Sequence, residues 1–327
     1  MTIESLFSVN TLGLLKKHGH SAADNGPCSP HRPAQPAFKL EGEYIDLLTA
    51  NSVCIQAGAR LLRDLSGSPV LIPKQLSDAN VYWVAQNSNI TKSDIALGNI
   101  SMTPKTMAIR CQVSNLLRML STPNIESILR ADFARLAAIE LDRVILRGTG
   151  SLEPLGLANM SGIPTLGLGT DGADLTWDNI IDMEGALEDA NAMPGGGSFA
   201  YVMNPKIKRR LKKIKVPQFS GDTGGAYVAP PVLSDRVMAD MLGHPLFTTT
   251  QLRTNLAKGT GTNLSELFFG NWSDLLVGMW GGVEILASNV AGDAWAQNAV
   301  EIRLVQNIDV QIRHLESVIY INDAKTV

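Results

Sequence analysis

The clearest periodic signal in the chain lies at residues 123–147, where apolar side chains recur every three or four positions. Thr122 is a candidate N-cap, Pro123 suits the first helical position, and Gly148 follows the last turn. The pattern predicts a helix about 37 Å long, which ends where Gly148 takes a left-handed conformation. Its apolar stripe consists of Ile125, Ile128, Leu129, Phe133, Leu136, Ala137, Leu141, Val144 and Ile145.

Two segments before this helix alternate between apolar and polar residues in the manner of strands. They cover residues 81–86 and 100–113, and the polar residues 87–99 join them. The side chains expected to share a face are Val81, Trp83 and Ala85 in the first segment, and Met107, Ile109, Cys111 and Val113 in the second. We expect a long hairpin whose tip is too polar to be buried within its own subunit.

The second half of the chain alternates helix and strand. One helix is expected from Thr176 to the PGGGS sequence at 194–198, and another from Asn204–Pro205 through Ile214. Strands are expected at 199–203, 267–271, 275–280, 283–288, 300–314 and 317–322. The chain has no repeat of fixed period, so the pattern predicts a mixed α+β architecture.

The composition favours a protein that assembles with other protein chains. Charged residues make up 18% of the chain, below the roughly 25% usual for soluble domains, so much of the surface is expected to lie against other protein. The net charge of −3 argues against holding nucleic acid through overall charge. Three scattered cysteines without a CxxC fit a reducing cytoplasm, and no stretch has the apolar length of a membrane helix. Residues 1–40, rich in proline after Pro27, are expected to form an extended arm that a neighbour would order.

Motifs that could indicate an enzyme are weak. The glycines of RGTGSLEPLGLAN (147–159) follow a helix, whose C-terminal dipole end repels phosphate, and they lack the Lys-Ser/Thr of a phosphate loop. SGDTGG places Thr223 where some hydrolases have their nucleophile, without the histidine motif this chemistry needs. The potential zinc ligands His18, His20, Cys28 and His31 match no common spacing. We therefore expect no enzymatic activity, no metal and no cofactor.

One run, KIKRRLKKIK at 206–215, is densely basic. Ile207, Leu211 and Ile214 fall on one helical stripe and leave the cations on the other faces. The cations are Lys206, Lys208, Arg209, Arg210, Lys212, Lys213 and Lys215. They could contact nucleic acid or an acidic neighbouring subunit, or simply face solvent; no interleaved aromatic residues offer stacking to bases.

The order of these segments, from about residue 44 to 322, resembles that of the major capsid proteins of tailed bacteriophages. The most specific part is the junction after the long helix, at Gly148, Gly150, Pro154, Gly156, Leu157 and Asn159. The resemblance implies an α+β Hong Kong 97-type capsid fold. It assigns residues 1–43 to an N-terminal arm, 44–79 to the first part of a peripheral domain and 80–112 to an extended loop hairpin. Residues 113–159 would continue the peripheral domain with its spine helix, and 160–282 would form an axial domain. Residues 283–315 would be peripheral strands, and 316–327 a strand that returns to the axial domain.

The same resemblance implies the function. Copies would assemble as pentamers and hexamers into an icosahedral shell around packaged double-stranded DNA, in the host cytoplasm and then in the virion. The partners would be further copies of the chain, a portal, and scaffold or cement proteins, with no membrane. Trp83 and Lys92 would lie in the extended loop.

Some family members link a loop lysine to a neighbour's asparagine. Here Lys92 and Asn298 match that pair, but Val305 replaces the assisting glutamate, so we expect no crosslink. Because about 40 residues precede the matching region, we also expect no proteolytic removal of a scaffolding segment.

The sequence is also compatible with other functions. An encapsulin-type compartment shell has the same fold and encloses enzymes instead of DNA, and a gene-transfer-agent capsid is a close variant. Outside the shell proteins, the chain could be a hydrolase that uses Thr223 or a DNA-binding protein that uses residues 206–215.

Overall fold

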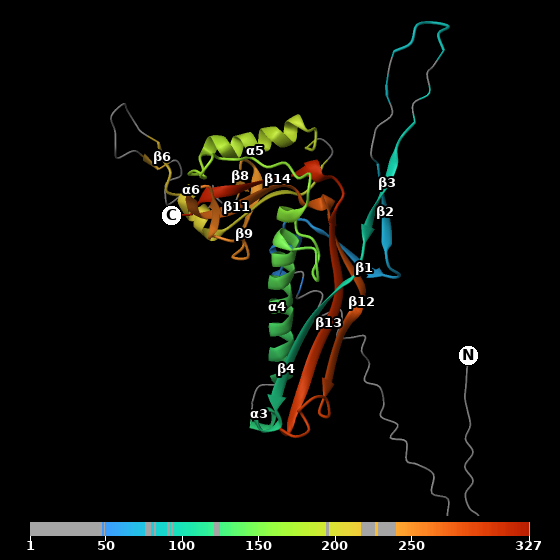
Figure 1. Cartoon of the computed structure of the whole chain (residues 1–327), viewed down its shortest axis with the longest axis vertical. Coiled ribbons are helices and arrows are strands. Elements are labelled where there is room, and N and C mark those ends of the chain that lie inside the picture. Colours follow the sequence, from blue (N-terminus) through green and yellow to red (C-terminus); the bar gives the residue numbers. More distant parts are fainter. Residues whose placement is uncertain are drawn as a thin grey trace, which may run out of the picture. The chain divides into compact units, whose positions relative to one another are not determined.

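The computed structural model describes residues 48, 50–75, 80–81, 83–89, 92, 94–120, 125–193, 196–216, 226–227 and 240–326 (Figure 1). The expected arm at 1–43, the N-cap Thr122, the hydrolase candidate Thr223 and the four potential zinc ligands all lie outside these residues.

A four-stranded sheet gathers strands from distant parts of the sequence, in the order β1-β12-β13-β4. The β1–β12 pair is parallel, whereas β13 pairs antiparallel with both of its neighbours. The strands are β1 (Arg60–Leu65), β12 (Leu275–Ser288), β13 (Ala299–Ile312) and β4 (Lys105–Ser114). In β4 the alternation is as expected, because Met107, Ile109 and Cys111 pack against the core and Val113 is buried. The two strands expected at 275–280 and 283–288 are one strand, whose register shifts between Trp280 and Glu284.

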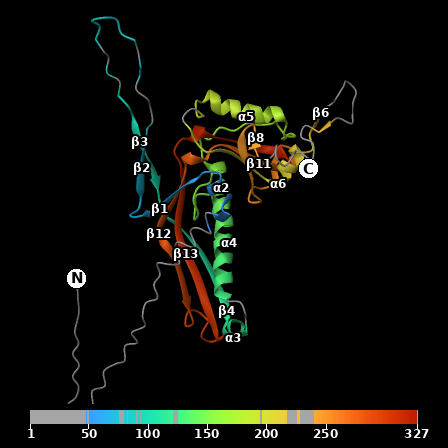
Figure 2. The same ribbon diagram turned by 180° about the vertical axis from the view of Figure 1, so that it is seen from behind.

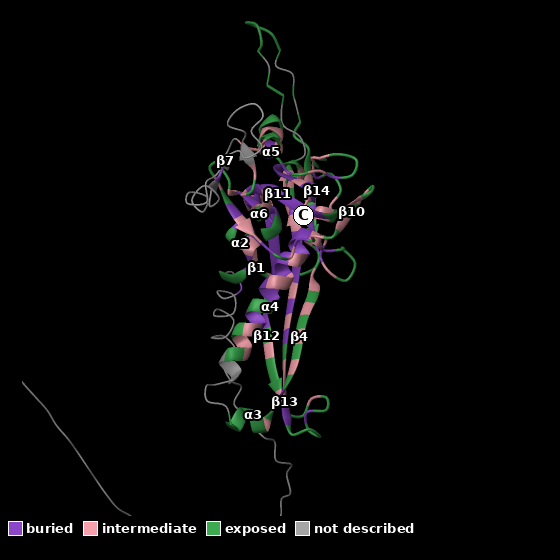
Figure 3. Cartoon of the chain, turned by 90° about the vertical axis from the view of Figure 1, so that its left-hand side faces the viewer, coloured by how far each residue is buried: buried purple, intermediate pink, exposed green. Residues whose placement is uncertain are grey.

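The long helix is confirmed as α4 (Ile125–Arg147), which lies along this sheet (Figures 1 and 2). Its buried face is formed by Phe133, Ala134, Ala137, Ala138, Leu141, Val144, Ile145 and Leu146. The expected stripe is wrong at Ile128 and Leu136, which are 53% and 40% exposed. Figure 3 shows burial increasing toward the C-terminal half of the helix, where the chain itself supplies a core.

The hairpin pairs different strands from those expected. Strand β2 (Val70–Gln75) pairs antiparallel with β3 (Leu97–Met102), and the described residues of 81–86, which exclude Tyr82, form no strand. The expected second strand is divided, because 105–114 joins the four-stranded sheet as β4. The physical reason lies at the base of the hairpin, where Val70 and Ile72 pack on the buried cluster of Met102 and Trp280. In the segment 81–86, by contrast, Val81 and Trp83 are fully exposed and cover no apolar surface of the described chain.

The second sheet is built mainly from the latter part of the chain. Its order is β10-β11-β5-β9-β8, and β14 pairs with β11 off this path. The strands are β10 (Leu256–Lys258), β11 (Gly261–Asn271), β5 (Phe199–Met203), β9 (His244–Thr248), β8 (Asp240–Met241) and β14 (Val318–Lys325). Helices α5 (Trp177–Asp189) and α6 (Pro205–Leu211) accompany it. Thr176 caps α5 and Asn204 caps α6, as the sequence predicts.

Shorter elements complete the described chain. They are α2 (Val53–Gln56), α3 (Asn115–Leu120), β6 (Lys215–Val216), β7 (Ala226–Tyr227), and three 3-10 turns, η1 (Leu157–Asn159), η2 (Trp272–Asp274) and η3 (Leu315–Ser317).

Two hydrophobic cores meet at the second sheet. On β5, Ala200 and Val202 belong to the core shared with α4, whereas Tyr201 and Met203 belong to the core beneath α5 and α6. Successive strand residues point to opposite faces, so β5 separates the two cores. One face of the second sheet therefore packs toward the first sheet and α4, and the other is covered by helices.

Asp142 on α4 fixes the chain that precedes β1. Its carboxylate is 3% exposed and accepts hydrogen bonds from the Ser52 hydroxyl at 2.7 Å, the Val53 N–H at 2.9 Å and the Cys54 N–H at 3.1 Å. Burial raises the pKa of Asp142, and these hydrogen bonds oppose the rise. The carboxylate thus satisfies N–H groups at the start of α2, which would otherwise be buried without partners.

We expect Asp142→Ala to lower the free energy of unfolding by about 3 kcal/mol, because three buried donors lose their acceptor. The control is Asp132→Ala on the same helix, which removes an exposed ion pair with Arg135 and is expected to change stability by less than about 0.5 kcal/mol. Denaturant unfolding of the unassembled subunit measures both values. Equal effects of the two substitutions would contradict the capping role of Asp142.

Candidate functional site

The junction after α4 is held by close backbone packing. Gly156 donates its N–H to the Gly148 carbonyl at 2.9 Å, and Thr149 and Leu155 form an isolated antiparallel bridge. Asn159 Nδ2 donates to the carbonyls of Gly148 at 2.8 Å and Arg147 at 3.3 Å. A loop thereby folds back on the last turn of the helix and satisfies its free carbonyl groups. Pro154 is buried within this loop.

The expected left-handed conformation at Gly148 is wrong, since positive φ occurs at Gly150 instead, with φ +82°. Glycine is required at position 148 because there is no room for a side chain. An added Cβ would lie 2.0 Å from the Pro154 carbonyl oxygen. At Gly156 an added Cβ would lie 2.2 Å from the Gly148 nitrogen and 2.6 Å from the Val144 oxygen. The glycine spacing therefore lets two backbone segments touch, and no anion site is formed.

Charged side chains that the sequence analysis missed support the junction. Arg143 forms ion pairs with Glu140 at 2.7 Å and with Glu153. Glu153 also accepts the Thr149 N–H at 2.9 Å. The hydrogen bonds from Arg143 are the main reason why the pKa of Glu153 falls from 4.5 to about 2.

Arg147, the last residue of α4, forms an ion pair with Glu266 on β11, and the two side chains are only 14% and 3% exposed. Burial raises the pKa of Glu266, and Arg147 opposes this rise. The pair joins the end of the helix to the second sheet. Helical spacing alone gives no sign of it, because its members are 119 positions apart in the sequence.

The residues predicted for the extended loop are strongly exposed. Trp83 is 101% exposed and Val81 96% exposed, so neither is covered by its own chain. The Lys92 ammonium lies 2.9 Å from Asp94, with both side chains largely in solvent. Asn298, the proposed counterpart of Lys92, accepts a hydrogen bond from Asn115 at 2.8 Å, and Val305 pairs with Ala108 and Glu284 in the sheet.

A second exposed apolar surface was not anticipated from the sequence. Helix α3 has no buried residue, although most of its side chains are apolar. The exposed apolar side chains of this helix and of the nearby connection between β12 and β13 are Leu116, Leu117, Met119, Leu120, Val290 and Trp295. Asn115 and Asn298 link the two segments through a backbone hydrogen bond of 3.1 Å.

The basic run departs from the expected helix through Ile214. Helix α6 ends at Leu211, turns follow, and Lys215 lies in β6, which pairs with β7. Lys215 and Val216 are already extended, because they pair with Tyr227 and Ala226 of β7. Lys206, Lys208, Arg209 and Arg210 are helical, whereas Lys212 and Lys213 lie in the turns after the helix.

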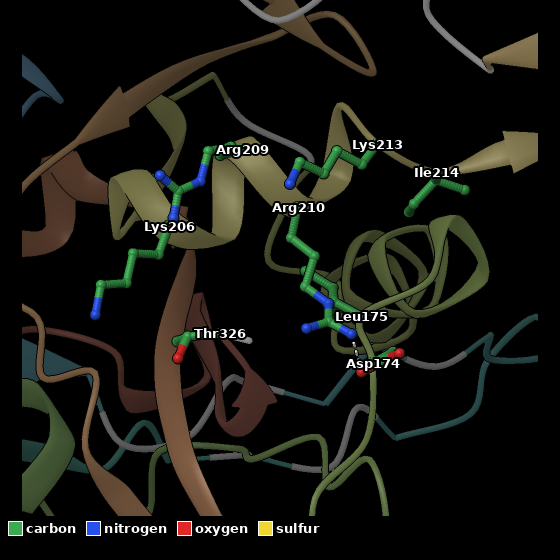
Figure 4. A pocket seen from close by; sticks show the side chains of 8 residues that line it. All are labelled: Asp174, Leu175, Lys206, Arg209, Arg210, Lys213, Ile214 and Thr326. Atoms are coloured by element: carbon green, nitrogen blue, oxygen red, sulfur yellow. Dashed lines mark ion pairs between the residues drawn. The ribbon is translucent and has the colours of Figure 1, made fainter.

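The helix and turns of this run border a depression of about 550 Å³ (Figure 4). Its lining includes Lys206, Arg209, Arg210 and Lys213, together with Asp174, Leu175, Ile214 and Thr326. Arg210 is paired with Asp174 at 2.6 Å, and Lys206 Nζ donates to the Thr254 hydroxyl at 3.2 Å. The lining could hold an anionic partner, and it contains no histidine among the described residues that could act as a base.

Within the described residues, no group of three or more His, Cys, Asp or Glu side chains could hold a metal ion. No helix in the described part of the chain has both the length and the apolar character needed to cross a membrane.

We expect Gly156→Ala to lower the free energy of unfolding by about 3 kcal/mol or more, since the new methyl group would overlap backbone atoms. Gly185→Ala is the matched control, because Gly185 lies inside α5 and an added Cβ would meet no atom within 4 Å. That control should gain roughly 0.5 kcal/mol from helix propensity. A tolerated alanine at 156, measured by denaturant unfolding, would refute the close packing.

Glu153→Gln provides a pH test of the junction. A carboxylate with a lowered pKa contributes stability that is present above pH 4.5 and is lost as the pH falls toward 2. The free-energy difference between the wild type and the variant should be about 1 kcal/mol at pH 7 and shrink over that interval. A difference that does not vary with pH would show that the ion pair with Arg143 contributes nothing.

Known proteins resemble this chain in sequence and in fold. The sequence model described as the phage capsid family matches residues 38–323. The major capsid protein of Halomonas phage phiHAP-1 is 28% identical over 275 residues, covering 84% of this chain and 41% of that protein. The major capsid protein of Klebsiella oxytoca phage phiKO2 is 23% identical over 298 residues, which cover 86% of this chain and 65% of that protein. The chain therefore spans less than two thirds of either relative.

Solved structures share the fold. The capsid of a native GTA particle aligns with a TM-score of 0.66 at 15% identity, covering 83% of this chain and 90% of that one. A structure of Gordonia phage Cozz gives a TM-score of 0.62 at 14% identity, covering 83% of this chain and 86% of that one. A structure of Microbacterium phage Oxtober96 gives a TM-score of 0.62 at 14% identity, covering 84% of this chain and 91% of that one. The match of the family across most of the sequence, together with this shared fold, shows that the chain belongs to the phage capsid family.

Proposed function

We propose that the chain is a structural shell subunit that assembles as pentamers and hexamers into an icosahedral capsid around packaged double-stranded DNA. Membership of the phage capsid family supports this function. The observation that carries it is the set of apolar side chains left in solvent at places where the chain has no core, including Trp83, Val81 and helix α3. Exposed apolar surface of this kind is characteristic of protein interfaces.

In this proposal the described elements take the roles expected from the family. The β2–β3 hairpin, together with residues 80–96, is the extended loop and lies over an adjacent subunit. Helix α4 is the spine of the peripheral domain, and the sheet built on β5 and β11 belongs to the axial domain. The exposed half of α4, with Ile128 and Leu136, would be covered by a neighbouring copy.

A gene-transfer-agent capsid is the second candidate, favoured by the structural likeness to a GTA particle capsid. Both candidates are shells that assemble from the same surfaces. DNA extracted from native particles separates them: a single phage genome would support the first, and random host fragments the second.

Electron microscopy of the purified full-length chain tests the function directly. Angular shells, or free pentamers and hexamers, are the expected result. A chain that stays monomeric at high concentration, with crowding agents and at both low and high salt, would contradict the proposal. Nuclease-protected DNA in native particles distinguishes a DNA-containing shell from an encapsulin-type compartment.

Trp83→Ser tests the exposed loop. Since the indole is 101% exposed, its loss should change the subunit's free energy of unfolding by less than about 0.5 kcal/mol while it strongly reduces shell formation. Gln86→Ser, an exposed polar change in the same segment, is the control and should assemble like the wild type. Normal assembly of Trp83→Ser, measured by light scattering and microscopy, would remove the loop from the interface.

A further inference from the structure

Charge is separated along the sequence around α5 and α6. Residues 148–205 contain eight acidic residues and no lysine or arginine. The next ten residues, 206–215, contain seven lysines and arginines and no acidic residue. The two segments pack on one core beneath the second sheet, with Ile180, Met183 and Leu187 from α5 and Ile207 and Leu211 from α6. One face of one sheet therefore carries a negative and a positive surface.

The negative surface is the outward side of α5. Buried Ile180, Met183 and Leu187 fix which side of the helix faces the core. The exposed acidic side chains, here called the acidic face, are Asp178, Asp182, Glu188 and Asp189. None of the four has a cation at ion-pair distance among the described residues, whereas Glu184 pairs with His244 at 3.4 Å. Ile181 lies among them and is 54% exposed.

The positive surface is the outward side of α6 and the turn after it. The basic face is defined here as Lys206, Lys208, Arg209 and Lys213. Within the described chain none of these four side chains forms an ion pair with a carboxylate, although Arg210 beside them is paired with Asp174. The adjoining depression is lined in part by the half-buried Ile214, beside which an aliphatic side chain such as Ile181 of another copy could pack.

Like charges lie close together on each face. Asp178 and Asp182 are four residues apart on α5, and Lys206 and Arg209 are three apart on α6, so their side chains are neighbours that repel. Glu188 and Asp189 lie at the C-terminal end of α5, where the helix dipole disfavours negative charge and the last turn has no basic residue. A partner of opposite charge would relieve each of these repulsions.

We propose that the acidic face of one copy docks on the basic face of the next copy, and that this contact sets neighbours head to tail around the capsomer ring. Because the faces are different surfaces of one subunit, the contact is heterologous, and repeating it closes a ring or propagates a filament. The inference rests on the proposed shell function and names the surfaces that hold its rings together.

A second copy explains the observations better than nucleic acid does. Nucleic acid would account for the basic face alone and would leave the acidic face without a partner. A second copy accounts for both faces at once. The net charge of −3 and the absence of aromatic residues from 206–215 also give little for nucleic acid to bind.

The test uses charge reversal on each face. The acid-reversed variant carries Asp178→Lys, Asp182→Lys and Glu188→Lys. The base-reversed variant carries Lys206→Glu, Arg209→Glu and Lys213→Glu. Each should remain folded by circular dichroism and fail to form rings, with a subunit–subunit Kd at least about tenfold above that of the wild type at low salt. A third variant with all six substitutions keeps the wild-type net charge, restores complementarity and should assemble.

Mixing the two single-face variants gives a stricter readout. The acid-reversed variant has two positive faces and the base-reversed variant has two negative faces. Each variant can therefore dock only on the other, and the two must alternate around a ring. Native mass spectrometry should find even-numbered rings such as hexamers with three copies of each variant, and no pentamers. The wild type should form both rings, and high salt should weaken its contact.

The outcomes separate this proposal from the proposed function. If the wild type forms shells and both reversed variants do so equally well, the docking of the two faces is wrong and the shell function stands. If only the base-reversed variant is impaired, through loss of DNA retention, the basic face binds nucleic acid and the proposal is overturned. If the wild type never assembles, the shell function itself fails.

Discussion

The close approach of two backbone segments at the end of α4 is the constraint on which the rest of the structure depends. Gly156 and Gly148 touch through their main chains, and this contact determines where the chain leaves the helix. The same turn positions Arg147 against the buried Glu266 on β11, so the helix that covers one sheet is joined at its end to the other. Replacing either glycine by a larger residue would separate segments that both sheets need.

The two sheets share a core without sharing a strand. Side chains from β5 and β11 reach into the core of α4, and alternate residues on the same strands serve the core under α5 and α6. Asp142 attaches a further piece of chain to this arrangement by providing the acceptors for α2. The well-packed interior contrasts with the hairpin, with α3 and with the outward sides of α5 and α6, where apolar or unbalanced charged side chains face solvent. In these regions the described chain leaves apolar or charged surface uncovered.

Sequence periodicity was informative wherever an element had a core of its own to face. The long helix, the N-caps at Thr176 and Asn204, and the inward side of β4 all followed from spacing. It failed within residues 81–86, where the described residues are exposed and form no strand, and at the end of α6, where turns follow Leu211. At Gly148 the sequence predicted a conformational need. The actual reason is contact with the backbone of Pro154, which lies six residues further along the chain. Pairs such as Arg147 with Glu266 could not be inferred from one sequence, because no local pattern relates positions so far apart.

The sheet topology has a consequence for the order of events during synthesis. Strand β1 pairs with β12 and β4 with β13, so each must wait for a partner made roughly two hundred residues later. Likewise β11 pairs with β14, which follows it only after β12 and β13. Contacts of such long range form slowly, because the intervening chain has to be brought together first. Completion of both sheets is therefore limited by pairings between distant segments, whereas the β2–β3 hairpin can form from segments that lie close together in the sequence.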